Sequence, residues 1–217
     1  MGKSLYSLML MDEVVEEIDK LALRLGTNRS NLVNQILAEH VSVSTPEKQI
    51  DSIFRQMEEL ISRSTDLVPL VTPNQLSMSV KSSLKYKYKP TVRYTVQLYR
   101  TPEDAVGELT VNFRSQSTGL LNSIARFFML WKQLEDYYLQ GVFEPGTIRY
   151  QLSESRFVRT IAVPKGRTYS AEDLSKGISD YVTFFDKAMK HYLAGMLTER
   201  DLELQYSRYL NSNNYLI

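Results

Sequence analysis

The first forty residues change their hydrophobic period once. Side chains at alternate positions of residues 3–11 fall into two sets, which predicts a short strand with one face against a core. One face carries Tyr6, Leu8 and Leu10, and the other carries Lys3, Leu5, Ser7 and Met9. From Asp12 to Leu25 apolar residues recur every three or four positions, which predicts an amphipathic helix. Gly26 is placed to end it, and Asn28 to cap a second helix whose buried stripe would be Leu32, Val33, Ile36 and Leu37.

The middle of the chain begins with a third predicted helix. Thr45 and Pro46 are typical of a helix start, and the apolar stripe that follows predicts a connecting helix over 46–66. Two prolines in 66–77 predict a loop. Three strands of an antiparallel meander are then expected at 79–89, 91–100 and 106–114.

The last third of the chain returns to helices. A helical stripe that includes Trp131 ends before Gly141, and a capping box opens a second helix at Ser170. Two strands between them, at 147–153 and 156–163, and a final helix over 198–210 complete the pattern. The predicted fold is therefore α+β: a module over 1–45, a connecting helix over 46–66, and an antiparallel sheet with packed helices over 67–217.

The composition is that of a soluble cytoplasmic protein. The chain has 217 residues and 43% hydrophobic content, and it contains no 18-residue apolar run and no signal-peptide pattern. Cysteine is absent, and the two histidines, His40 and His191, lie in separate predicted helices. We expect no metal, no cofactor and no membrane contact.

About forty residues bury too little apolar surface to fold alone, so the N-terminal unit is expected to need a second copy. Two paired strands would cover four helices and form a ribbon wide enough for a DNA major groove. Residues 3–42 resemble the ribbon-helix-helix family of bacterial repressors, the Arc and methionine-repressor type. The resemblance rests on the alternating strand and on the sequences DEVVEEIDKL, GTNRS and LVNQIL.

The resemblance implies a homodimeric, sequence-specific transcriptional regulator that binds double-stranded DNA. It assigns base contacts to Lys3, Leu5, Ser7 and Met9, and phosphate contacts to Asn28, Arg29 and Ser30. The side chains of Leu5 and Met9 offer no hydrogen bond to a base edge. Residues 1–45 hold four Lys or Arg and six Asp or Glu, and their net charge of −2 gives little attraction to phosphates. An alternative is therefore an adaptor or antitoxin-like protein that uses the unit only to dimerise.

A second charged region lies in the predicted strands. Between residues 81 and 100 there are six basic residues and no acidic one, namely Lys81, Lys85, Lys87, Lys89, Arg93 and Arg100. Arg149, Arg156, Arg159, Lys165 and Arg167 extend the bias. These residues predict a surface for single-stranded nucleic acid or a pocket for an anionic effector, and a solvated strand face is the alternative interpretation.

Catalytic motifs are missing from the sequence. There is no glycine-rich phosphate loop, no Gly-x-Ser-x-Gly and no His-Glu-x-x-His. Adjacent acids such as Glu135 and Asp136 lie on predicted helices, where sequence neighbours diverge, so we interpret them as solvated. The sequence predicts a regulator and not an enzyme, with the C-terminal domain serving oligomerisation, a small-molecule effector or a protein effector.

Overall fold

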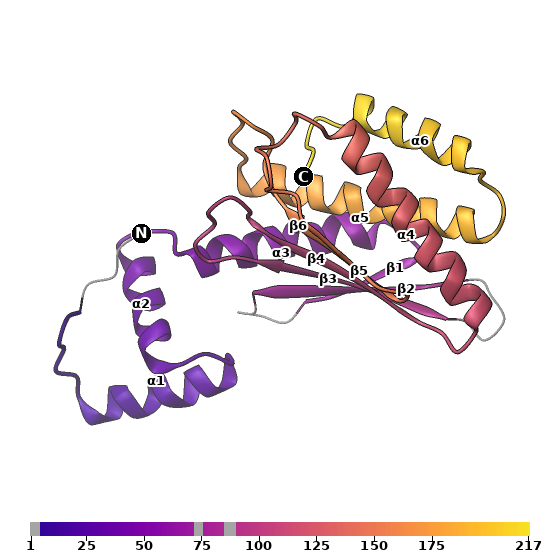
Figure 1. Ribbon diagram of the computed structural model, residues 1–217. Helices are drawn as coiled ribbons and strands as arrows, with labels where there is room; N and C mark the ends of the chain where they lie inside the picture. Colours follow the sequence, from indigo (N-terminus) through magenta and orange to yellow (C-terminus); the bar gives the residue numbers. More distant parts are fainter. Residues whose placement is uncertain (1–4, 72–75, 85–89) are drawn as a thin grey trace.

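The computed structural model describes residues 5–71, 76–84 and 90–217 (Figure 1). Within them the chain forms the helices α1 (Asp12–Arg24), α2 (Arg29–His40), α3 (Pro46–Ser62), α4 (Thr118–Tyr138), α5 (Ala171–Leu193) and α6 (Glu199–Ser212). The strands are β1 (Leu67–Leu70), β2 (Ser77–Ser83), β3 (Thr91–Leu98), β4 (Gly107–Arg114), β5 (Tyr150–Leu152) and β6 (Arg156–Ile161). The fold is therefore α+β, as predicted.

The six strands form one antiparallel sheet in the order β1-β2-β3-β4-β6-β5. The predicted meander is confirmed, because β2, β3 and β4 pair in sequence order. Burial alternates along β3, where Val92, Tyr94 and Val96 are buried on one face. In β2, β3 and β4 this period of two places one side of the sheet in the core and leaves the other for polar residues, whereas in β6 every residue after Arg156 is buried.

The predicted loop over 66–77 is wrong in its first part. Residues 67–70 form β1, and Pro69 stands opposite Val80 of β2. Proline cannot donate a hydrogen bond to a sheet ladder, so its presence argued against a strand. The strand tolerates it because β1 is at the edge of the sheet, where only one side of the strand has a partner.

The core lies between the sheet and the helices α3, α4 and α5, and α6 packs outside α4 and α5 (Figure 1). Phe185 of α5 lies at the centre, with its ring 4.7 Å from Trp131 and 5.3 Å from Phe157, measured between centroids. The ring of Phe184 stacks on Tyr209 of α6 at 4.3 Å. We refer to the strands β1–β6 together with the helices α3–α6 as the body.

The third helix is more than a connection. Thr45 caps α3 by accepting a hydrogen bond from the Lys48 amide at 3.3 Å, as its sequence predicts. Ile53, Phe54 and Met57 are buried and belong to the main core, where α3 packs on α5 and β1. The helix that follows the N-terminal module is therefore an integral part of the body.

A buried ion pair lies beneath α4. Arg159 of β6 donates from Nε to Glu135 of α4 at 3.0 Å, and both side chains are at most 1% exposed. The Tyr181 hydroxyl donates to the same carboxylate at 2.8 Å, and Arg159 also donates to the Ile217 carbonyl oxygen. Burial acts to lower the pKa of the Arg159 guanidinium, but the charge of Glu135 outweighs it and holds the pKa above its ordinary value.

Two sequence interpretations are wrong at this pair. The expectation that Glu135 lies on a solvated helix face is wrong, because Glu135 is buried and only its neighbour Asp136 is exposed. Arg159 was counted with the basic strand surface, but it points into the core. The reason is shared: each charge is neutralised by the other and by further hydrogen bonds, which lets both leave water.

The N-terminal strand of the predicted ribbon is not formed in the single chain. Residues 5–11 belong to no helix or strand, and a ribbon-helix-helix motif is not evident in the described residues. They run as a separate segment before α1 (Figure 1). A two-stranded ribbon takes its hydrogen bonds from a second chain, so one chain by itself offers this segment no strand to pair with.

Candidate nucleic-acid interfaces

The N-terminal hairpin, which we define as α1 and α2, has almost no core of its own. Ala22 and Leu32 are its only buried residues among those described, although a stripe of four was predicted for α2. Ile36 and Leu37 of that stripe are 43% and 52% exposed. α1 and α2 pack on each other and stand apart from the body (Figure 1).

The segment before the hairpin is apolar and exposed. Leu5 and Met9 are fully exposed, while Leu8 and Leu10 on the alternate positions are 61% and 43% exposed. Ser7 is exposed as well, and Lys3 lies outside the described residues. Tyr6 of the predicted inward face is also 82% exposed, so neither face of this segment is covered in the single chain.

The turn between the two helices is built as its residues predict. Gly26 has a φ of +63°, a left-handed conformation that favours glycine. The Asn28 side chain accepts a hydrogen bond from the Asn31 amide at 2.9 Å and so caps α2. The amides of Arg29 and Ser30 open the helix without a partner in the described chain, as first-turn amides do.

Arg29 is held by the neighbouring helix. Its Nε donates to Asp19 of α1 at 2.7 Å, and a second guanidinium nitrogen contacts the other carboxylate oxygen. This hydrogen bond keeps the pKa of Asp19 below its ordinary value. Both side chains are about half exposed, so the pair clips α1 to α2 and leaves part of the guanidinium open to solvent.

The second candidate interface is the face of the sheet opposite the helices. We define the uncovered sheet face by the residues that point away from the helices on four strands. They are Ser77, Ser79, Lys81 and Ser83 of β2; Thr91, Arg93, Thr95 and Gln97 of β3; Glu108, Thr110, Asn112 and Arg114 of β4; and Arg156 of β6. α3 to α6 all lie on the other side (Figure 1). Ser79 and Thr95 on this face have hydroxyl oxygens 3.4 Å apart, as expected for cross-strand neighbours.

Four cations gather on the uncovered sheet face. Lys81 and Arg93 were named from the sequence and lie directly opposite each other on β2 and β3. Arg156 belongs to the wider basic bias seen in the sequence. Arg114 was missed, because only the strand register places it opposite Thr91 and diagonal to Arg93. Lys85, Lys87 and Lys89 lie outside the described residues. Arg100 instead pairs with Glu47 at 3.0 Å.

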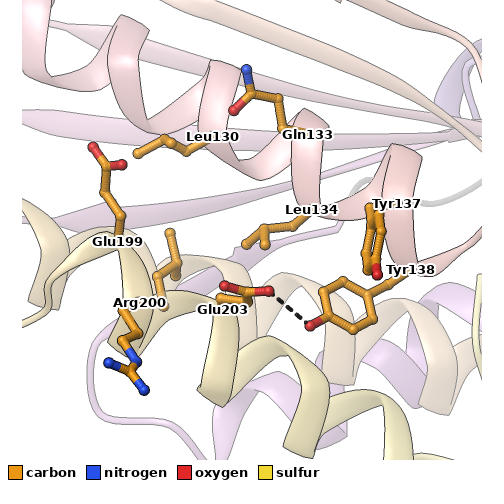
Figure 2. A pocket seen from close by; sticks show the side chains of 9 residues that line it. Leu130, Gln133, Leu134, Tyr137, Tyr138, Glu199, Arg200 and Glu203 are labelled. Carbon is orange, nitrogen blue, oxygen red and sulfur yellow. Dashed lines mark hydrogen bonds between the residues drawn. The ribbon is translucent and has the colours of Figure 1, made fainter.

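A cleft of about 540 Å³ lies between α4 and α6 (Figure 2). Leu130 and Leu134 form its apolar side, and Glu199 and Glu203 come from α6. The Tyr138 hydroxyl donates to Glu203 at 3.0 Å, which raises the tyrosine pKa. Arg200 lines the cleft as well, so its rim carries both signs of charge, and the cleft is a candidate place for an effector.

A second polar cluster lies under β3 and α5. The buried Asp186 accepts from the Tyr94 hydroxyl at 2.9 Å and pairs with Lys190 at 2.7 Å. Burial is the main cause that raises the pKa of Tyr94, followed by the negative charge of Asp186. These groups satisfy one another, so the cluster ties the helix to the sheet and offers no free acid, base or nucleophile.

The described part of the chain has no cluster of three or more His, Asp or Glu side chains placed to hold a metal ion. None of the helices described is both long and apolar enough to span a bilayer. No protein-family model, curated protein or solved structure matches the chain. The N-terminal hairpin with the segment before it and the uncovered sheet face are the two candidate interfaces of the protein.

Proposed function

We propose that the protein is a sequence-specific DNA-binding transcriptional regulator that acts as a homodimer or higher oligomer in the cytoplasm. In this proposal two copies pair residues 3–11 as an antiparallel ribbon that enters the DNA major groove. The amides that open α2, with Asn28, Arg29 and Ser30, hold a phosphate. The body then oligomerises or binds an effector, and the protein is not an enzyme.

One observation carries the proposal: an exposed apolar segment leads directly into a two-helix hairpin that buries only two of its own residues. Surfaces of this kind are covered in a functional protein by a partner. Residues 5–11 alternate in exposure, so a second copy of the same segment can cover the Tyr6, Leu8 and Leu10 side while the Leu5, Ser7 and Met9 side stays outward.

The test is selection of fragmented genomic DNA by the purified full-length protein at near-physiological salt, followed by sequencing of the retained fragments. We expect short repeated sites, in line with a two-fold protein. A Ser7→Glu/Arg29→Ala variant should lose them, because it places a carboxylate on the ribbon and removes the cation at the helix start. An Arg200→Gln/Arg208→Gln variant, altered only on α6, is the matched control.

The second candidate function is a protein-interaction adaptor or antitoxin-like protein in which the paired segment serves dimerisation alone. The apolar outward side chains of Leu5 and Met9 favour it, since they offer no hydrogen bond to a base edge. A dimer in sedimentation experiments that enriches no DNA sequence in the selection would favour this function over the first.

A further inference from the structure

Exposed cations without an ion pair among the described residues occur on α6, at Arg200 and Arg208, and on the uncovered sheet face, where four of them gather on adjacent strands. On the helices, Arg63, Lys132 and Lys176 each pair with a carboxylate one turn away, at or below 2.9 Å. Lys81, Arg93, Arg114 and Arg156 are exposed and form no ion pair with another described residue. Four strands therefore present four cations that no described carboxylate neutralises.

Their placement is unfavourable without an anion. Lys81 and Arg93 lie directly opposite each other, and like charges in such pairs destabilise a sheet. Lysine often protects a sheet edge from pairing with another chain, but β3, β4 and β6 are interior strands of this sheet. Edge protection therefore does not account for the three arginines, whereas a bound polyanion would relieve their repulsion.

The rest of the face indicates the kind of anion. One row runs across the sheet from Lys81 through Arg93 and Asn112 to Arg156, a span of about 14 Å at the usual strand spacing. Serine, threonine, asparagine and glutamine fill most of the other positions, and Glu108 is the single carboxylate. Among its described residues the face carries no aromatic side chain, so this part offers phosphate donors and no platform for stacking bases.

We infer that the uncovered sheet face binds the phosphate backbone of duplex DNA, as a second and sequence-independent contact beside the N-terminal ribbon. The inference rests on the proposed function in one respect, because the ribbon is what would bring duplex DNA to the protein. The hairpin projects on the side of the sheet away from α6, which leaves this face open beside it (Figure 1). The contact holds DNA to the body while the ribbon reads the sequence.

The test measures binding of the full-length protein to a fluorescein-labelled, mixed-sequence 30-base-pair duplex across a salt series. The variant Arg93→Gln/Arg114→Gln removes two charges from the face, and Arg200→Gln/Arg208→Gln removes two from α6. Each lost phosphate contact lowers the slope of log affinity against log salt by about 0.9. We expect a slope lower by about 1.8 and at least tenfold weaker binding at low salt, with the α6 variant like wild type.

An unchanged slope in the face variant would overturn the inference, as would tighter binding of the matching 30-nucleotide single strand than of the duplex. Both variants and Ser7→Glu/Arg29→Ala are then compared on a selected site and on the mixed duplex. If only the face variant weakens binding and no site is preferred, the ribbon proposal fails and the sheet contact stands. If only the ribbon variant loses its site, the sheet contact fails.

Discussion

The hairpin and the body use similar amphipathic helices and reach opposite results. In the body, a stripe on each helix meets a sheet or another helix, so Trp131, Phe157 and Phe185 are fully buried. In the hairpin, the apolar residues of α2 stay half exposed because only α1 faces them. An amphipathic stripe therefore becomes buried only where a partner surface covers it, and that surface can belong to another chain.

The largest expected effect lies in the body, at the buried ion pair. Arg159→Met should lower the free energy of unfolding by about 3–5 kcal/mol, because it leaves Glu135 charged in an apolar site. Urea unfolding followed by the fluorescence of Trp131 measures it, since Trp131 donates to Tyr181 beside the pair. Glu135→Leu/Arg159→Met is the control and should recover much of the loss. A single variant within 1 kcal/mol of wild type would contradict the role of the pair.

The next effect concerns the hairpin and its proposed partner. Leu8→Asp places a charge at a position that pairing would bury, so the dissociation constant of the dimer should rise at least tenfold, about 1.4 kcal/mol. Sedimentation equilibrium measures the constant, and Trp131 fluorescence should stay unchanged because no residue of 5–11 belongs to the core around Trp131. Met9→Asp on the outward side is the control. Equal dimerisation in Leu8→Asp and wild type would remove the basis of the ribbon.

A smaller effect is expected from a helix cap of the body. Ser170 accepts from the Asp173 amide at 3.2 Å, and the Asp173 carboxylate accepts from the Ser170 amide at 2.9 Å. Ser170→Ala should therefore cost about 1 kcal/mol of unfolding free energy in the Trp131 assay. The equivalent Asn28→Ala in the hairpin should leave that assay unchanged and reduce only the helical circular dichroism. A change in Trp131 unfolding for Asn28→Ala would show that hairpin and body unfold as one unit.

The smallest effect concerns the exposed clip between α1 and α2. Arg29→Ala should return the pKa of Asp19 toward its ordinary value, since the lost hydrogen bond is the main cause of its depression. A lowered pKa in the folded state stabilises the hairpin above about pH 4, and this contribution is lost as the pH falls through the lowered value. Carboxylate NMR titration measures the shift, with Lys20→Ala as a control. An unchanged Asp19 pKa would show that the clip does not form in solution.

Local patterns were sufficient for much of the fold. The alternation in β3, the caps at Asn28, Thr45 and Ser170, and the left-handed Gly26 were all predicted and are confirmed. Each depends on residues within a few positions of one another, so the chain carries the information locally. The turn and cap at the start of α2 belong to this group, while the phosphate contacts assigned to Asn28, Arg29 and Ser30 stay a prediction.

Other features depend on residues far apart in the chain. Arg114 lies among the cations of the uncovered sheet face only because β3 pairs with β4. Arg159 points to the other side of the sheet, where it pairs with Glu135 of α4. Pro69 is accepted in a strand because β1 ended at the edge.

The sequence by itself therefore determined the helices, most of the strands and the apolar face of each, because period and capping act over short distances. The tertiary structure alone decided which charges are buried in pairs and which gather unpaired on the open sheet, because both depend on strand order and register. Whether residues 5–11 form a strand depends on a second chain, since an isolated strand has no hydrogen-bond partner until a second strand is placed beside it.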